Sequence, residues 1–386
     1  MGVCTGVTSA LIGLERWRVQ AYHGPVKILH VETGRHLYGG PQQVIYLMRG
    51  LAELGHEGEL VCPPASGIDN AARAEGITVR NLFCAGDLDL PFAYRLTQYI
   101  NETKPDLVHC HSRRGADVLG GLAASFAEVP AVVSRRVDNT ELKLLAALRY
   151  RPFEKVIAIS EAVASALRNR GIEDVRIEVI RSAVDANAFR ETPDCKAMRR
   201  EFNVPSDCFV MAAAGQLIER KGHRYLLKAA DALRKRQAPF RLIIFGDGPL
   251  DAELRADAAS RKLGDIVQFV GFRDDLDAFF GCLDLFVHPS LAEGLGVATL
   301  KAQAAGVPVV GFAAGGLTEA IADGETGRLV PPGDADGLAS AIEAFMDDPA
   351  LAERMGEAGR TRMKEEFSIE TMARRHVALY ESVLSD

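Results

Sequence analysis

The amino-acid sequence predicts an α/β protein made of two doubly wound domains that face each other across a cleft. Short apolar runs alternate along the chain with amphipathic stretches of helical period. Nearly continuous apolar strands between helices are typical of parallel sheets that helices cover on both faces. A polar, proline-bearing break at residues 185–205 separates two such regions, and 386 residues suffice for two domains of ordinary size.

Each expected element is an apolar run or an amphipathic stretch bounded by turn residues. The expected strands are 27–31, 59–62, 77–82, 106–110, 131–134, 156–159, 177–180, 209–213, 241–245, 267–270, 283–287 and 307–310. The clearest expected helices are 43–54, 220–236 and 250–262. We expect an N-terminal domain at 27–187, a C-terminal domain at 188–367, and a last helix at about 368–386 that packs back on the first domain. Residues 1–26 indicate a loose extension, or a start codon placed too early.

The composition is that of a globular protein, with 48% hydrophobic and 25% charged residues. A net charge of −7 argues against attraction to polyanions, so no nucleic-acid partner is expected. The first half is relatively basic: residues 27–185 hold 19 Lys and Arg against 20 Asp and Glu, whereas residues 186–386 hold 24 against 31. The basic residues that cluster in the first half are Arg113, Arg114, Arg135, Arg136, Lys143, Arg149 and Arg151.

The cysteines point to a reducing compartment. All seven are scattered singly with no C-x-x-C pair, which argues against a disulfide framework and against a zinc site. The sequence has no run of 18 apolar residues, so no membrane-spanning helix is expected. We therefore expect the protein in the cytoplasm.

Two glycine-bearing loops follow expected strands and favour anion binding. Gly39-Gly40 precedes a helix, where small residues let the backbone approach an anion and the helix start offers free N–H groups. An ordinary turn is the alternative. Arg220-Lys221, in the loop from Gly215 to Gly222, places two cations at a helix start, against the helix dipole. A bound diphosphate would offset that cost, and two solvated side chains are the alternative.

A carboxylate and a histidine pair mark two further strand ends. Glu293 precedes a glycine-rich helix start, where it can accept hydrogen bonds from sugar hydroxyls while the next N–H groups face phosphate. Helix capping is the alternative. His109 and His111 lie on one face of a strand and could hold a metal, but we expect no third ligand nearby. A single histidine facing the cleft is the favoured interpretation.

Other motifs point away from metals and cofactors. Asp87-x-Asp89 and Asp334-x-Asp336 resemble metal-binding pairs, but each lies in a loop beside a proline, as turn residues do. The turn at Gly246-Asp247-Gly248 lacks the third glycine of a dinucleotide-binding loop. We expect neither a metal nor a cofactor.

The stretch 139–155 combines leucines with basic residues. It predicts either an interfacial helix on a membrane or, as the favoured alternative, a helix docked on the sheet with a wet basic face. The residues concerned are Leu142, Leu145, Leu148, Lys143, Arg149 and Arg151.

From residue 27 to about residue 379, these motifs resemble those of family four of the retaining glycosyltransferases, whose fold is GT-B, two Rossmann-like domains around a cleft. In the second half the resemblance is carried by Leu217-x-x-x-Lys221-Gly222, Gly246-Asp247-Gly248-Pro249, Phe269-Val270-Gly271, Pro289-Ser290-x-x-Glu293-Gly294-x-Gly296, Ala304-x-Gly306-x-Pro308 and Gly315-Gly316-x-x-Glu319. In the first half it is carried by Gly39-Gly40, Gly55-His56, His109-x-His111, Ser160-Glu161 and Val184-Asp185-x-x-x-Phe189.

The resemblance implies metal-independent transfer of a hexose-type sugar with retention of anomeric configuration. It implies that Glu293 holds the sugar hydroxyls, that His111 lies beside the reacting carbon, and that Arg220 and Lys221 neutralise the departing diphosphate. The residues expected to bind the donor are Gly39, Gly40, Gly215, Gln216, Gly246, Phe272, Arg273, Gly294, Leu295, Gly296, Val297 and Lys301.

The sequence departs from the family pattern in three places. Gln216 stands where the family usually has Arg, Lys301 stands where it has a second Glu, and Ser182-Ala183 replaces Asn-Gly. We expect Lys301 to supply, from the ribose side, the charge lost at Gln216. A lysine that points into solvent is the alternative.

The resemblance implies a nucleotide-diphosphate sugar as donor, with a UDP-sugar favoured over a GDP- or ADP-sugar. The expected acceptor is an anionic or lipid-linked saccharide of envelope polysaccharide or lipopolysaccharide, held by Arg113, Arg114, Arg135 and Arg136. Peripheral contact with the cytoplasmic face of the inner membrane is a further expectation. The alternatives are a nucleotide-sugar epimerase of the same fold and a non-catalytic sugar-nucleotide sensor, the latter suggested by Lys301.

Overall fold

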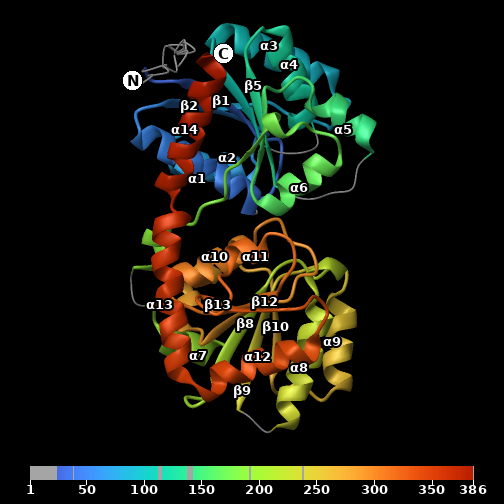
Figure 1. Cartoon of the computed structure of the whole chain (residues 1–386), viewed down its shortest axis with the longest axis vertical. Helices are drawn as coiled ribbons and strands as arrows, with labels where there is room; N and C mark the ends of the chain where they lie inside the picture. Colours follow the sequence, from blue (N-terminus) through green and yellow to red (C-terminus); the bar gives the residue numbers. More distant parts are fainter. Residues whose placement is uncertain are drawn as a thin grey trace, which may run out of the picture.

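The computed structural model describes residues 24–37, 39–111, 115–136, 142–190, 193–236 and 239–385. Two α/β units, each with one parallel sheet between helices, lie end to end (Figure 1). This confirms the predicted fold class, because every paired strand of both sheets runs parallel and the strands are largely buried.

The first sheet has seven strands in the order β3-β2-β1-β4-β5-β6-β7. Its strands are β1 (Lys27–Val31), β2 (Glu57–Cys62), β3 (Thr78–Asn81), β4 (Leu107–Cys110), β5 (Ala131–Arg135), β6 (Lys155–Ala158) and β7 (Ile177–Val179). All four residues of β4 and all five of β5 are buried. Successive strands are added on one side of β1 up to β3 and on its other side from β4 onward. The strand order therefore switches between β1 and β4, which are hydrogen-bonded parallel neighbours. Such a switch point opens a crevice at the carboxyl ends of the strands.

The second sheet has six strands in the order β10-β9-β8-β11-β12-β13. Its strands are β8 (Phe209–Ala214), β9 (Phe240–Phe245), β10 (Val267–Gly271), β11 (Leu285–His288), β12 (Val309–Phe312) and β13 (Gly327–Val330). Its switch point lies between β8 and β11. Strand β13 was not predicted, because this edge strand contains Arg328 and has only one fully buried residue, so no apolar run marks it.

Helices cover both sheets. The α-helices are α1 (Gly39–Glu53), α2 (Gly67–Ala74), α3 (Leu90–Thr103), α4 (Gly121–Phe126), α5 (Lys143–Tyr150), α6 (Glu161–Asn169), α7 (Cys195–Glu201), α8 (His223–Lys235), α9 (Asp251–Ser260), α10 (Val297–Ala304), α11 (Leu317–Ala320), α12 (Ala335–Asp347), α13 (Pro349–Glu366) and α14 (Ile369–Ser385). Shorter helices are the π-helix η1 (Ala116–Gly120) and the 3-10 helices η2 (Asp174–Arg176), η3 (Ala186–Phe189), η4 (Glu219–Lys221), η5 (Leu276–Ala278) and η6 (Phe280–Cys282). None of the helices within the described ranges is long and apolar enough to cross a membrane.

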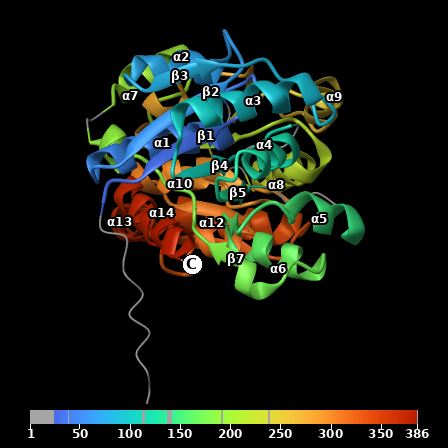
Figure 2. The ribbon, with the colours of Figure 1, turned by 90° about the horizontal axis from the view of Figure 1, so that it is seen from above.

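The last helix belongs spatially to the first domain. Helix α14 runs upward from the second domain onto the first and lies beside α1 (Figure 1), and α13 and α14 occupy one side of the molecule (Figure 2). It buries Met372, Leu379 and Tyr380 in a cluster with Ile28 of β1 and Leu47 of α1. Helix α14 therefore packs on the first domain and contributes to its core.

Two of the aspartates in the D-x-D pairs cap helices. Asp89 accepts a hydrogen bond from the Phe92 amide at 3.0 Å at the start of α3. Asp334 accepts one from the Gly337 amide at 2.8 Å at the start of α12. Their carboxylates thus have the local structural role expected for them.

Helix α5 docks with a different face from the one predicted. Ala146 and Tyr150 face the core, and Arg149 donates to Asp117 of η1 at 2.8 Å. Leu142, at the helix N-cap, and three leucines within α5 are exposed, each more than half: Leu142, Leu144, Leu145 and Leu148. The expected basic outer face is present at the exposed Lys143 and Arg151, but Arg149 is turned inward, and the leucines lie outside because Ala146 and Tyr150 form the buried face.

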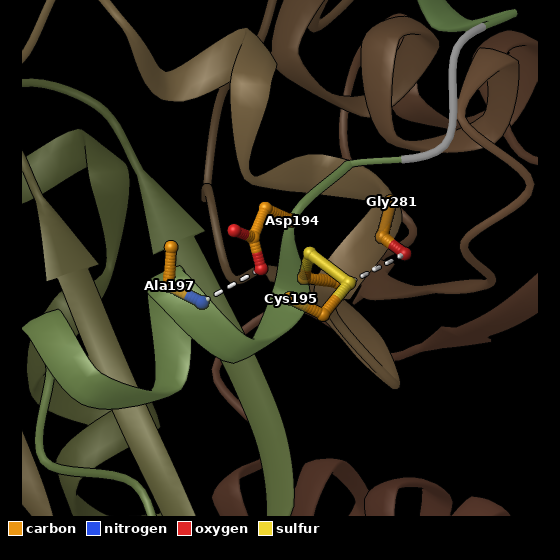
Figure 3. Close-up of a disulfide and its surroundings, with 5 residues drawn as sticks. Asp194, Cys195, Ala197 and Gly281 are labelled. Carbon is orange, nitrogen blue, oxygen red and sulfur yellow. Dashed lines mark hydrogen bonds between the residues drawn. A yellow bond between two sulfur atoms is a disulfide. The ribbon is translucent and has the colours of Figure 1, made fainter.

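The expectation of unpaired cysteines is also wrong at one pair. Cys195, the first residue of α7, forms a disulfide with Cys282 of η6 (Figure 3). The two residues are 87 positions apart in sequence, but packing of α7 against η6 brings their Cα atoms to 5.1 Å. Sequence spacing alone does not reveal this proximity. Among the described cysteines, the free ones are Cys62, Cys84, Cys110 and Cys208.

Candidate active site

Several of the predicted site residues follow the strands at the two switch points. The ends of β1 and β4 lead to the loop before Gly39 and to His111. The ends of β8 and β11 lead to the loop that begins at Gly215 and to the loop that holds Glu293. Loops that are distant in sequence therefore lie at the switch points of the two sheets.

Glu293 is at the centre of a dense polar contact. Its carboxylate pairs with Lys221 and accepts a hydrogen bond from His288 Nε2 at 3.0 Å. Ser290 Oγ lies 3.4 Å from the same oxygen, and the Gly294 amide donates to the other oxygen at 3.2 Å. Lys221 and Glu293 side chains are each 13% exposed, so the pair is largely removed from water yet reaches the surface of the cleft.

These contacts fix protonation states. Burial alone would raise the pKa of Glu293, but the His288 hydrogen bond and the charge of Lys221 outweigh it and hold that pKa well below its usual range. An ionised carboxylate only accepts, so His288 carries its proton on Nε2. His288 Nδ1 then accepts from the Thr299 hydroxyl at 2.9 Å. Burial lowers the pKa of His288, with Glu293 opposing it.

Close backbone packing sets the positions of these loops. A Cβ on Gly222 would lie 1.9 Å from the carbonyl oxygen of Pro289, so only glycine allows the two loops to meet. The Leu291 amide donates to the Arg220 carbonyl at 2.8 Å across the same junction. The Glu293 loop is thus held directly against the Lys221 loop.

The two domains also touch across the cleft at glycines. A Cβ on Gly39 would lie 3.5 Å from Cγ2 of Val297, so the first residues of α1 and α10 face each other. A Cβ on Gly294 would lie 2.4 Å from the carbonyl oxygen of Arg136, which follows β5. The starts of α1 and α10, whose first N–H groups lack intrahelical partners, therefore lie next to each other.

His111 is buried in a histidine cluster that the sequence did not predict in full. His30 of β1 lies beside it, with His30 Nδ1 and His111 Nε2 2.9 Å apart. His30, His109 and His111 each place one nitrogen within 4.8 Å of the others, a geometry that can hold a metal ion. The expectation that no third ligand lies nearby is therefore wrong, because neighbouring strands β1 and β4 pair His30 directly with His109.

The cluster already satisfies most of its nitrogens within the protein. His109 is bound on both sides, by Tyr380 of α14 at 2.7 Å and by Ser134 at 2.8 Å. Burial lowers the pKa of His30 to about 3 and holds the pKa values of His109 and His111 well below the usual value, so all three are neutral near pH 7. A metal would have to displace at least one of these hydrogen bonds.

The other predicted donor residues lie around the cleft with varied surroundings. Gln216 and Arg220 are exposed, and Arg220 Nη1 lies 3.4 Å from the Ala292 carbonyl. Lys301 donates to both oxygens of Asp277 in η5, at 2.9 and 2.7 Å. The pairing with Asp277 was not expected. The Asp277 carboxylate balances the charge of Lys301 in this structure.

The loop after β10 holds two more predicted donor residues. Phe272 is exposed. Arg273 pairs with Glu201 and with Asp275, whose Oδ1 lies 2.7 Å from Arg273 Nε. The amide of Gly246, which follows β9, donates to the Gly271 carbonyl at 2.7 Å and so ties the two turns together.

Of the four arginines predicted to bind the acceptor, the structure describes two. Arg113 and Arg114 lie outside the described residues. Arg135 ends β5 and is buried, whereas Arg136 is half-buried and its guanidinium lies 3.4 Å from His111 Nδ1. At least this arginine therefore faces the predicted donor site.

Two histidines of the site, His288 and His30, were not predicted from the sequence. His288 is the only polar residue of β11, directly before the Pro289-Ser290 motif, and that position was the available signal. For His30, the signal was a histidine within the apolar run that follows Lys27 in β1. Both are buried, and each contacts a residue that the sequence did predict, Glu293 or His111.

Comparisons with known proteins identify the class. The model described as "Glycosyltransferase Family 4" matches residues 38–188, and that of "Glycosyl transferases group 1" matches residues 194–362. The lipopolysaccharide core biosynthesis glycosyltransferase LpsE of Rhizobium meliloti is 28% identical over 92% of this chain and 99% of its own. The glycogen synthase of Mycobacterium tuberculosis is 30% identical over 72% of this chain and 69% of its own.

A solved structure shows the same architecture. Anabaena Alr3699/HepE in complex with UDP-glucose superposes with a TM-score of 0.82 at 23% identity, covering 92% of this chain and 100% of its own. The fold is thus of the GT-B type, and the two family models show that its class is glycosyltransferase. The chain belongs to glycosyltransferase family four.

Proposed function

We propose that this glycosyltransferase moves a hexose-type sugar from a nucleotide-diphosphate sugar, with retention of anomeric configuration and without a metal. The observation that carries the proposal is the ionised Glu293, held by Lys221 and His288 beside the start of α10. A carboxylate can accept hydrogen bonds from sugar hydroxyls. The adjacent cation and the helix N–H groups can stabilise a diphosphate.

In the proposed reaction the bond between the anomeric carbon and the diphosphate oxygen breaks. The acceptor oxygen bonds to that carbon from the same face, and its proton passes to the departing phosphate oxygen. Lys221 and Arg220 stabilise the charge that grows on the leaving group, together with the first amides of α10. His111 lies beside the reacting carbon in this proposal. Closure of the domains excludes water.

A UDP-sugar is the favoured donor, ahead of a GDP- or ADP-sugar. The Anabaena protein was crystallised in complex with UDP-glucose, which supports this order without deciding it. A thermal-shift screen with UDP, GDP and ADP tests the proposal, because a ligand that binds the folded state raises its melting temperature. The matching nucleotide sugar should then release nucleotide slowly. No shift with any of the three nucleotides would refute the proposal.

For the acceptor we propose an anionic or lipid-linked saccharide of envelope polysaccharide or lipopolysaccharide. Support comes from the basic cluster of the first domain and from relatives such as LpsE, whose name places it in lipopolysaccharide core biosynthesis. Replacing Arg113 and Arg114 with Gln should raise the acceptor KM and leave donor hydrolysis unchanged. A matched loss of both activities would count against acceptor binding by these residues.

We further propose that α5 contacts an anionic lipid surface. Its leucines face outward, with the basic Lys143 and Arg151 exposed beside them, and this combination suits a membrane interface. Co-sedimentation with vesicles of neutral lipid, with and without phosphatidylglycerol, tests it. Binding should require the anionic lipid and be lost in Leu144→Asp/Leu148→Asp. Binding that survives this change would place the contact elsewhere.

A further inference from the structure

Arg136 stands where the two domains meet, between two loops of the predicted donor site. It follows β5, and its carbonyl oxygen packs against Gly294 of the second domain. On its other side, a Cβ on Gly40 would lie 3.3 Å from the Arg136 Cδ. The arginine side chain thus runs past the start of α1, while its backbone touches the residue after Glu293.

Three other basic residues of the two domains have a carboxylate partner. Lys221 pairs with Glu293, Lys301 with Asp277, and Arg181 with Glu319. For Arg136, the described part of the chain offers no ion pair. Its one hydrogen-bond contact is His111 Nδ1, at 3.4 Å, and its Nε is buried without a partner among the described residues.

A half-buried guanidinium without a carboxylate is unfavourable, because charge is removed from water with little compensation. Burial accordingly lowers the pKa of Arg136 to about 10, while the charge of Glu32 opposes that shift. The group remains cationic near pH 7. A bound anion would supply the missing partner.

The surroundings of Arg136 favour a diphosphate as this anion. Gly40 and Gly294 adjoin the starts of α1 and α10, where helix N–H groups attract phosphate oxygens. The same place is where the donor's diphosphate lies in the proposed function. The second domain also lacks a cation at Gln216, which is exposed in the Lys221 loop.

We propose that Arg136 binds the diphosphate of the donor from the N-terminal domain, in place of the charge absent at Gln216. This inference rests on the proposed function and changes the expected role of Arg136 from acceptor to donor binding. It also gives the donor a contact in each domain, so that donor binding draws the domains together. Arginine suits the task because its planar fork can hold two phosphate oxygens at once.

The experiment compares titration calorimetry of the wild type, Arg136→Gln, Arg136→Lys and the control Arg375→Gln, whose side chain is exposed on α14. The probes are the nucleoside diphosphate selected by the thermal-shift screen and the corresponding monophosphate. Arg136→Gln should weaken diphosphate binding about 10-fold or more and monophosphate binding less than about 2-fold. Arg136→Lys should lie between, and Arg375→Gln should match the wild type.

A rescue variant and a stability measurement separate binding from folding. Adding Gln216→Arg to Arg136→Gln should recover part of the lost diphosphate affinity. The melting temperature of Arg136→Gln without ligand should be at least that of the wild type, because an unpaired buried charge is removed. If Arg136→Gln does not fold, Arg136→Lys carries the same comparison of the two nucleotides.

The outcomes distinguish this inference from the proposed function. A wild type that binds no nucleoside diphosphate overturns both. A wild type that binds it, with unchanged affinity in Arg136→Gln and a raised acceptor KM, overturns only the inference and returns Arg136 to the acceptor. Equal loss of diphosphate and monophosphate binding also overturns it, since the contact would then not be to the terminal phosphate.

Discussion

Lys221 and Glu293 form an ion pair between the loops that follow β8 and β11, and each side chain is only 13% exposed. The pair lies beside the start of α10, so a carboxylate and an ammonium group are presented together at one edge of the sheet. We interpret Glu293 as the sugar ligand and Lys221 as the phosphate ligand, already held together before a donor arrives.

The first prediction concerns Glu293. Glu293→Ala should lower kcat for transfer about 10- to 150-fold, the range for a charge-assisted hydrogen bond made mainly in the transition state. Binding of the nucleoside diphosphate alone should persist or tighten, because Lys221 loses its internal partner. Steady-state kinetics and calorimetry measure the two effects, with the exposed Glu325→Ala as control. A kcat within about 2-fold of the wild type would move the sugar site elsewhere.

The second prediction concerns the ion pair itself. Lys221→Met should lower kcat and also destabilise the fold by roughly 3 kcal/mol, because it leaves Glu293 buried without its cation. Lys221→Met/Glu293→Gln should recover part of that stability and no activity. Urea unfolding at pH 7 of both single variants and the double variant gives the coupling. Strictly additive stability changes would show that the pair contributes little to folding.

The third prediction is a loss of stability in mild acid. Burial lowers the pKa of His30 to about 3 and the pKa of His376 to about 4, whereas an unfolded histidine titrates near 6.5. Below about pH 6.5 the unfolded chain therefore binds protons that the native chain excludes. The free energy of unfolding should be fully retained above that pH and should fall as the pH drops towards 4.

Urea unfolding between about pH 4.5 and 7 measures this dependence. Each such histidine contributes a slope of up to about 1.4 kcal/mol per pH unit. His376→Gln should reduce the slope by about that amount, whereas the exposed His36→Gln should leave it unchanged. An unaltered slope in His376→Gln would mean that His376 takes up its proton in the native state as well.

The fourth prediction uses Asp277 to test Lys301. If Lys301 holds the nucleotide from the ribose side, it must leave Asp277, to which it donates at 2.7 and 2.9 Å. Asp277→Asn should then lower the donor KM, and Lys301→Ala should raise it several-fold, about 1 kcal/mol. Initial rates at varied donor concentration measure both. Equal, negligible effects would reduce the pair to an exposed salt bridge of little energetic weight.

Much of the fold follows from the sequence, because buried parallel strands leave a strong pattern. The runs at residues 107–108 and 131–133 are apolar, and the structure completely buries the strands that contain them. Edge strand β13 lacks this pattern, since Arg328 and other partly exposed residues interrupt it. Pairs such as Cys195 and Cys282 depend on the packing of distant segments, which local periodicity does not encode.

The candidate site divides in the same way. Glu293, Lys221 and the glycine-rich helix starts are short local motifs, so their chemistry could be inferred from the sequence. His30 and His288 contact site residues on an adjacent strand or in a loop. The strand register of β1 with β4 places His30 beside the His109-x-His111 motif, and the loop after β11 folds back so that Glu293 reaches His288. The outward leucines of α5 depend on which face the domain buries, and the helix is too short for its periodicity to decide this.

The most direct test of the central claim is the anomeric configuration of the sugar that first leaves the donor. Proton NMR can follow slow hydrolysis of the nucleotide sugar selected by the thermal-shift screen, with EDTA present and Glu293→Ala as control. We predict that an α-linked donor yields the α-anomer first, before mutarotation, at a rate that EDTA does not change. Initial appearance of the β-anomer, an isomerised donor, or release that requires added Mn²⁺ or Mg²⁺ would contradict the account.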